Sequence, residues 1–260
     1  MTDGEGDESR SIDDTTFAVD VPIEFLERAV YVPAAETLVV ADLHLGRAAA
    51  SAVDAPIDDG GDVLARLETL LAQTAPTTVV VAGDLLHAFS SVPEGVDWDV
   101  TRLERAVADA DADLVVTPGN HDSMLETVYA GQTAECYRLA DGETVVCHGH
   151  ERPVLEGDDD PEPQPQPRRY IVGHDHPALS IGGRKLPCFL YGENVYRGAD
   201  VLMLPAFTRS AAGATVNNHR VRDFQSPLIR DADAMAPGVR DESSASVLWF
   251  PPLGKSRRLL

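Results

Sequence analysis

Cysteine is scarce in this sequence. The three cysteines, Cys136, Cys147 and Cys188, are odd in number and form no C-x-x-C pair. Such a distribution argues against a disulfide framework and against a zinc site built from thiolates. We expect the three thiols to be buried, reduced and chemically inert.

Lysine is scarcer still, with two residues in the chain, Lys185 and Lys255. Acidic residues dominate: 43 Asp and Glu stand against 21 Lys and Arg, which gives a net charge of -22. A field of this sign disfavours the coating of DNA or of an anionic membrane over a broad surface. A small site with local positive charge could still bind phosphate.

The preference for arginine over lysine on an acidic chain suits a cytoplasm at molar salt. There the Debye length shrinks to roughly 3 Å, so repulsion among the carboxylates is largely screened. We therefore expect a halophilic source, and an ordinary acidic protein is the alternative.

Long apolar runs are absent too. No run approaches the roughly 20 residues that a membrane-spanning helix needs, and the N-terminus lacks the basic and apolar regions of a signal peptide. We expect a soluble, cytoplasmic protein with no membrane partner. Residues 1–16 are polar and acidic, which predicts a disordered tail. For residues 17–260 we expect a single domain, interrupted by a Pro-rich, acidic loop insertion at 157–167.

Short apolar runs rich in valine predict buried strands. Between the first three runs, the segments 62–73 and 98–110 repeat apolar residues at helical spacing. The resulting β-α-β-α-β order predicts a mostly parallel sheet covered by helices. After Ile181 the chain is richer in strands and turns and shows no clear helix. The five runs that matter for the site are TLVVADLH, TTVVVAGD, DLVVTPGNHD, TVVCHGH and YIVGHDH.

Each of these five runs ends in Asp, Asn or His residues, which are side chains of the types that bind metals in proteins. Ligands of α/β sheets collect at the carboxyl ends of the strands, because the loops converge there. Residues two apart in an extended chain point to the same side, so a D-x-H or H-x-H pair can reach one ion. The candidate ligands, in chain order, are Asp42, His44, Asp84, Asn120, His148, His174 and His176.

A single D-x-H, G-D or H-x-H fragment is weak evidence, because each occurs often by chance. Here the fragments occur together in one consistent order, and the five runs contain six of the eight histidines. The alternative, a set of unrelated core or surface histidines, must explain every placement separately.

With the motif order D-x-H, G-D, G-N-H-D, H-G-H and G-H-x-H, the sequence resembles the calcineurin-like metallophosphoesterases over about residues 37–180. The fragments DLHLGR, GDLLH and GHDHP are similar to those of a group that includes ligase-associated DNA-processing phosphoesterases and their archaeal relatives. The resemblance implies an α/β fold, a four-layer α-β-β-α sandwich with a dinuclear metal site at the C-terminal ends of strands.

The resemblance also implies two divalent metal ions. Two such ions ionise a shared water and clamp the phosphoryl oxygens during in-line attack. Two metals, two carboxylates and one hydroxide sum to roughly +1, so the centre attracts phosphate even inside an acidic protein. Imidazole and carboxylate ligands without thiolate suit manganese, iron or zinc, and the resemblance favours Mn2+. By the same resemblance, Asp42, His44 and His176 bind one ion, Asn120, His148 and His174 bind the other, and Asp84 bridges them.

Four further residues are candidates beside the ligands. By resemblance, His121 faces the scissile phosphate, as general acid for the leaving oxygen or as a transition-state donor. Asp122 could orient His121 and hold its proton, or cap a helix over SMLETVYA; the two roles are compatible. Arg47 could contact a substrate phosphate or be a solvated loop residue. His87 could line the pocket, although a packed position beside the ligands is favoured.

These observations predict a dinuclear metal-dependent phosphoesterase that hydrolyses phosphodiester or phosphomonoester bonds by metal-hydroxide attack. The substrate could be a nucleic acid or a nucleotide, and the sequence indicates no protein partner. A non-catalytic interaction scaffold of the same fold is the alternative, but it would be expected to lose Asp84 or His121. A mononuclear zinc hydrolase would leave several of the seven ligands without a task.

Overall fold

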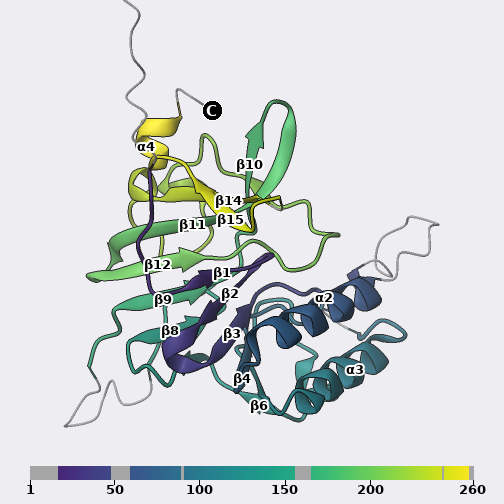
Figure 1. Cartoon of the computed structure of the whole chain (residues 1–260). Helices are drawn as coiled ribbons and strands as arrows, with labels where there is room; N and C mark the ends of the chain where they lie inside the picture. Colours follow the sequence, from purple (N-terminus) through teal and green to yellow (C-terminus); the bar gives the residue numbers. More distant parts are fainter. Residues whose placement is uncertain (1–16, 48–58, 89–90, 156–164, 242, 258–260) are drawn as a thin grey trace, which may run out of the picture.

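Two β-sheets face each other at the centre of the molecule and share an apolar core (Figure 1). The computed structural model describes residues 17–47, 59–88, 91–155, 165–241 and 243–257. The predicted tail at 1–16 lies outside the described residues, and so do residues 157–164 of the predicted loop insertion. Among the helices that the structure describes, none has the length and apolar character needed to cross a membrane.

The first sheet contains three of the predicted runs. β3, β4 and β5 are parallel, with α2 following β3 and α3 following β4 along the chain. This confirms the predicted β-α-β-α-β order. The sheet order is β1 (Glu24–Phe25), β2 (Ala29–Val32), β3 (Thr37–Val40), β4 (Thr78–Val81), β5 (Asp113–Val116) and β6 (Gln132–Thr133).

Helices α2 (Asp59–Thr74) and α3 (Val96–Asp109) cover the outer side of this sheet (Figure 1). Both begin two or three residues before the predicted ranges. Each buries one apolar face: Leu67 of α2 and Val100 of α3 are almost fully buried. Trp98 lies on the opposite face of α3 and is 60% exposed. Helical spacing, rather than residue type, therefore decides which side chains reach the core.

The second sheet is built from the later part of the chain. Its main path runs in the order β13-β10-β11-β12-β9-β8-β7, and β14 pairs with both β11 and β15. The elements are β7 (Cys136–Arg138), β8 (Thr144–Cys147), β9 (Arg169–Val172), β10 (Pro177–Ile181), β11 (Arg184–Tyr196), β12 (Ala199–Met203), β13 (Ala214–Thr215), β14 (Ala236–Asp241) and β15 (Ser246–Trp249).

Alternation along the strands divides the core into three apolar layers. Successive strand residues point to opposite faces, so Val80 packs between the sheets whereas Val81 packs under α2 and α3. Likewise, Ile171 faces the first sheet and Val172 faces the outer layer of the second. The predicted α/β four-layer fold is confirmed. The fourth layer is made of short pieces: η3 (Val221–Asp223), η4 (Ala232–Ala234) and α4 (Leu253–Ser256).

The cysteines are free, as expected, but two of them are neighbours. Cys136 on β7 is paired in register with Cys147 on β8. Cys147 and Cys188 are buried, whereas Cys136 is only half-buried. The expectation that all three are buried is therefore wrong for Cys136, because β7 lies at the edge of its sheet.

Leu67→Ala tests the packing of α2 on the first sheet. Leu67 is 1% exposed, so the substitution removes buried methyl groups and leaves a cavity, at a cost of about 2–5 kcal/mol in the free energy of unfolding. Chemical denaturation measures the change. The neighbouring Glu68→Ala, on the exposed face, serves as control and is expected to change stability by less than about 0.5 kcal/mol. Equal effects of the two variants would contradict the burial of this face.

Candidate metal centre

All five predicted runs end at one edge of the two-sheet core. β3, β4 and β5 are parallel neighbours in the first sheet, and β8 and β9 are parallel neighbours in the second. Backbone hydrogen bonds continue past the strand ends, from Asp42 N–H to Gly83 O and from Gly173 N–H to His148 O. The loops that carry the candidate ligands are thereby held side by side.

Asp42, His44, Asp84 and His176 form a first group, in which one ligand atom from each residue lies within 4.8 Å of the others. His44 Nε2 is 3.1 Å from His176 Nε2 and 3.7 Å from Asp84 Oδ2. His176 Nε2 is 3.4 Å from Asp42 Oδ1. Three of the four residues are buried, and His176 is half-buried. These donor atoms converge on one point, where a single cation could contact them all.

A second group surrounds His148. Its Nε2 lies 3.1 Å from Asn120 Oδ1, 3.2 Å from His174 Nδ1 and 3.6 Å from Asp84 Oδ1. Asp84 therefore presents one carboxylate oxygen to each group. The structure brings all seven predicted ligands together, with Asp84 between the two groups.

The backbone at five of these seven residues is left-handed. The φ angles are 56° at Asp42, 47° at His44, 48° at Asp84, 77° at His174 and 47° at His176. This conformation costs a residue with a Cβ about 1–2 kcal/mol, and such strain gathers at functional sites. Five of the twelve non-glycine residues with positive φ in the described part of the chain are thus candidate ligands.

Glycines precede several of the ligands because the loops approach one another closely. A Cβ on Gly83, whose φ is +79°, would lie 2.0 Å from Nδ1 of His148. A Cβ on Gly119 would lie 2.1 Å from Asp84 Oδ1. A side chain at either position would displace a candidate ligand.

Burial controls the charge of the centre. It lowers the pKa of His44 to about 3 and that of His148 to about 4, so both imidazoles are neutral at neutral pH, the form that binds metal. Burial and the nearby Asp42 carboxylate raise the pKa of Asp84 to about 8. Burial opposes ionisation of Asp42 as well, but the surrounding histidines outweigh it and lower the pKa. Buried carboxylates beside neutral imidazoles fit divalent cations.

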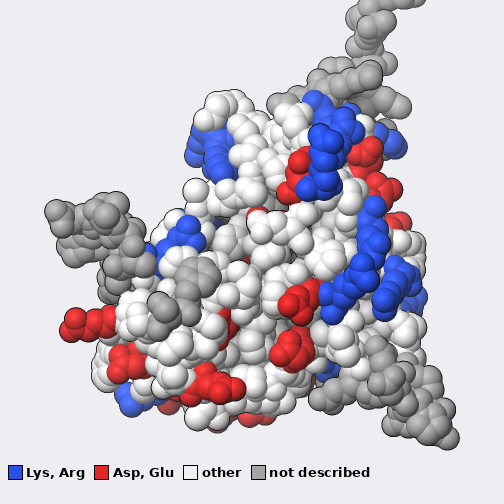
Figure 2. Space-filling view, turned by 180° about the vertical axis from the view of Figure 1, so that it is seen from behind, with Lys and Arg blue, Asp and Glu red and all other residues white. Residues whose placement is uncertain are grey.

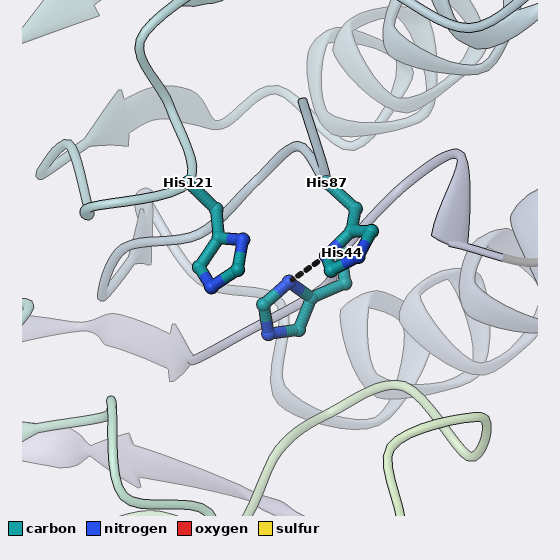
Figure 3. Close-up of side chains that lie close together, drawn as sticks. All are labelled: His44, His87 and His121. Atoms are coloured by element: carbon teal, nitrogen blue, oxygen red, sulfur yellow. Dashed lines mark hydrogen bonds between the residues drawn. The ribbon is translucent and has the colours of Figure 1, made fainter. Parts of the chain in front are cut away.

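His87 and His121 pack beside His44 of the first group, and one ring nitrogen from each of these three histidines lies within 4.8 Å of the others (Figure 3). His87 Nδ1 lies 3.3 Å from His44 Nδ1 (Figure 3), whereas His176 contacts the other nitrogen of the His44 ring, Nε2. The rings of His87 and His121 are stacked, with centroids 4.9 Å apart. His121 Nε2 is 4.0 Å from Asp84 Oδ2. His87 therefore occupies the expected packed position, where its contact with Nδ1 of His44 fixes the orientation of the His44 ring.

Asp122 does not cap a helix, so that part of the prediction is wrong. The segment forms only a 3-10 turn, η2 (Leu125–Thr127), whose N-cap is Met124. The Asp122 carboxylate instead accepts backbone N–H groups of Leu85, Leu86 and Gly119, at 2.8 to 3.2 Å. It ties the loop after β5 to the loop after β4.

Asp175 is a site residue that the sequence reasoning missed. It lies between His174 and His176, is 7% exposed, and accepts the backbone N–H groups of Gln225 and Ser226. These bonds fix the ligand loop to a segment fifty residues later. An acid between two histidines is visible in the sequence, but its distant partners are not.

A cavity of about 330 Å³ opens beside the ligands. Arg47 is half-buried and lines it, a position from which it could contact a substrate phosphate. The opposite wall comes from a part of the chain that the motifs do not reach. The lining residues include Asp84, Asn120, His121, His174 and His176 on the ligand side, and residues 211–214 and Gln225 on the other.

The fold is similar to that of a solved nuclease. The Pseudomonas putida nuclease MPE is 23% identical, with 88% of this chain and 94% of that chain covered and a TM-score of 0.57. YfcE, a phosphoesterase from E. coli, is 17% identical, with 83% and 98% covered and a TM-score of 0.40. No curated protein matches the chain.

The family model for the calcineurin-like phosphoesterase domain matches residues 36–207. This range includes every candidate ligand and both sheets' ligand-bearing strands. Since the match spans well over half of the sequence, the chain belongs to the calcineurin-like phosphoesterases and is a metal-dependent hydrolase of phosphate esters.

Proposed function

We propose that the chain hydrolyses phosphodiester or phosphomonoester bonds at a centre of two divalent cations. The observation that carries this proposal is the meeting of seven side chains from five strand ends in two groups that share Asp84. A mononuclear centre would leave the second group unused. An interaction scaffold has no need for five strained residues around buried carboxylates.

The two groups divide the ligands between the cations. When bound, two divalent cations supply a nucleophile from water and neutralise charge on the phosphoryl oxygens. We propose manganese as the metal, with iron or zinc as alternatives, because the donors are imidazole and carboxylate without thiolate. Asp42, His44 and His176 would hold one cation, Asn120, His148 and His174 would hold the other, and Asp84 would contact both.

The chain's own groups position and polarise the ester. Arg47 lines the cavity and offers a guanidinium to the phosphate oxygens. His121 lines the same cavity close to Asp84, where its ring N–H can donate to the leaving oxygen or to the phosphoryl group. Asp122 acts as a positioning residue, since its bonds to three amides hold the His121 loop against the Asp84 loop.

Removal and return of metal tests the proposal directly. The chain is purified at high salt, because its composition predicts a salt-rich cytoplasm, then stripped with a chelator and assayed with a chromogenic phosphodiester and a phosphomonoester. We expect activity to be lost on stripping and restored by Mn2+, with about two metal ions bound per chain by elemental analysis. Activity that survives complete stripping, or a stoichiometry of one, would contradict a dinuclear centre.

Asp84→Asn is expected to abolish activity and to lower metal content, because a neutral amide replaces the carboxylate that both ligand groups share. In metal-free protein the same substitution is expected to raise Tm. The folded-state pKa of Asp84 is about 8, against an ordinary value of 3.8 for an aspartate, so its burial destabilises the fold increasingly as pH rises through this window. Thermal melts from pH 4 to 8 measure the difference. A variant that melts below the wild type without metal refutes this account.

His121→Ala is expected to retain metal and fold but to turn over about 10²–10⁴ times more slowly, because His121 faces the cavity without belonging to either ligand group. His219→Ala is the control, since His219 packs on Phe224 and is not among the residues that line the cavity. Steady-state kinetics and metal analysis compare the two. Loss of metal in the first variant, or full activity, overturns the role given to His121.

A further inference from the structure

Positive side chains lead out of the cavity along the β10–β11 hairpin. We propose that Arg184 and Lys185, at the tip of this hairpin, bind the phosphodiester backbone of a nucleic-acid strand whose scissile phosphate lies in the cavity. The inference rests on the proposed function and names the substrate class of the same site.

The hairpin begins at the metal centre. β10 starts directly after His176, and the His176 carbonyl accepts the N–H of Ala214 from the cavity wall. β10 and β11 are joined by Gly182 and Gly183. Both glycines have positive φ, 56° and 76°, as in a tight two-residue turn that matches the twist of the strands. The tip is therefore a short, defined projection and not a long loop.

Lys185 lies at the rim of the cavity. It is paired with Ser180, and its ammonium donates to the carbonyl of Gly213, a residue that lines the cavity. Ser180 is four residues beyond His176, which is about 13 Å at the rise of a β-strand. Arg184 is one residue nearer the tip, opposite Ile181. Arg47 in the cavity and Lys185 at its rim thus lie on one path of positive charge. Arg184, as the neighbouring strand residue, points to the other face of the hairpin and adds positive charge at the tip.

The charges of this tip are available to a ligand. Arg184 and Lys185 are exposed, and within the described part of the chain neither forms an ion pair with a carboxylate. By contrast, Arg66, Arg209 and Arg222 are paired with acids. Figure 2 shows blue side chains at the projecting hairpin, apart from the acidic patches lower on the same face. On a chain of net charge -22 such a tip attracts phosphates locally.

This arrangement predicts a preference for strands over small esters. A small diester fills the cavity and contacts Arg47, whereas a strand with several phosphates also reaches the hairpin. Contacts between cationic side chains and phosphates are charge-assisted and weaken with salt, by a slope of about 0.7 per contact for single strands. The hairpin should therefore affect KM for oligonucleotides and leave chemistry on a small diester unchanged.

The test compares an Arg184→Ala/Lys185→Ala double variant with an Arg222→Ala/Lys255→Ala control of equal charge change, whose residues are also exposed but lie on the outer layer of the second sheet. The Mn2+-loaded proteins are assayed on bis(4-nitrophenyl) phosphate and on single-stranded 12-mers of DNA and of RNA. In the hairpin variant we expect KM for the 12-mers to rise about tenfold, which corresponds to about 1.4 kcal/mol for the two lost contacts together, with the small diester within about twofold. A plot of log KM against log salt should become shallower by about 1.4 units, because two contacts of about 0.7 each are lost.

Each possible outcome either supports or overturns the role proposed for the hairpin. Unchanged oligonucleotide kinetics in the hairpin variant, an equal loss on the small diester, or an equal loss in the control overturns the proposal. An Arg184→Glu/Lys185→Glu variant with the same KM as the alanine variant also counts against it, because charge reversal must weaken binding further. A loss confined to DNA or to RNA supports it and identifies the sugar. Failure of the wild type to hydrolyse even the small diester refutes the proposed function instead.

Discussion

Two carboxylates, Asp42 and Asp84, are buried where the two sheets meet, and the rest of the site follows from that burial. Ionised carboxylates are costly to remove from water unless positive charge balances them. The neighbouring imidazoles are themselves buried, and this lowers the pKa of His44 and His148. They therefore supply lone pairs and little positive charge. Divalent cations are the partners that satisfy both sets of groups at once.

The need to bring buried ligands together also explains why the backbone around them adopts unfavourable conformations. Five residues with left-handed φ and glycines packed against ligand side chains are unfavourable locally. They persist because neighbouring strands impose the loop positions. Asp122 and Asp175 contribute in the same way, each tying a ligand-bearing loop to backbone amides far along the chain. Carboxylates thus have two separate tasks here: some face the metal positions, and others hold the loops that carry them.

Electrostatics separate the catalytic cavity from the rest of the surface. The chain as a whole repels polyanions, with a net charge of -22. The cavity nevertheless contains Arg47, and Lys185 stands at its rim. A negative surface with a positive entrance limits non-specific binding while it leaves one path open to phosphate. Fold alone does not determine such a preference, because it depends on the side chains at the cavity and on the β10–β11 hairpin, which follows the last candidate ligand.

The amino-acid sequence by itself determined the β-α-β-α-β core and predicted the seven candidate ligands that the structure brings together. Both depend on short-range patterns: apolar periodicities of two and 3.6 residues, and polar residues at the ends of parallel strands. These patterns placed Asp42, Asp84 and His148 on neighbouring strand ends without reference to the rest of the chain.

Only the tertiary structure decided which residues support those ligands. His87 behind His44, Asp122 on the amides of Leu85 and Leu86, and Lys185 at the cavity rim are all contacts across long stretches of sequence. The same holds for the short fourth layer and for the meeting of Cys136 with Cys147. Local pattern carries no information on such contacts, because strand register and loop packing are settled only when the two sheets close on each other.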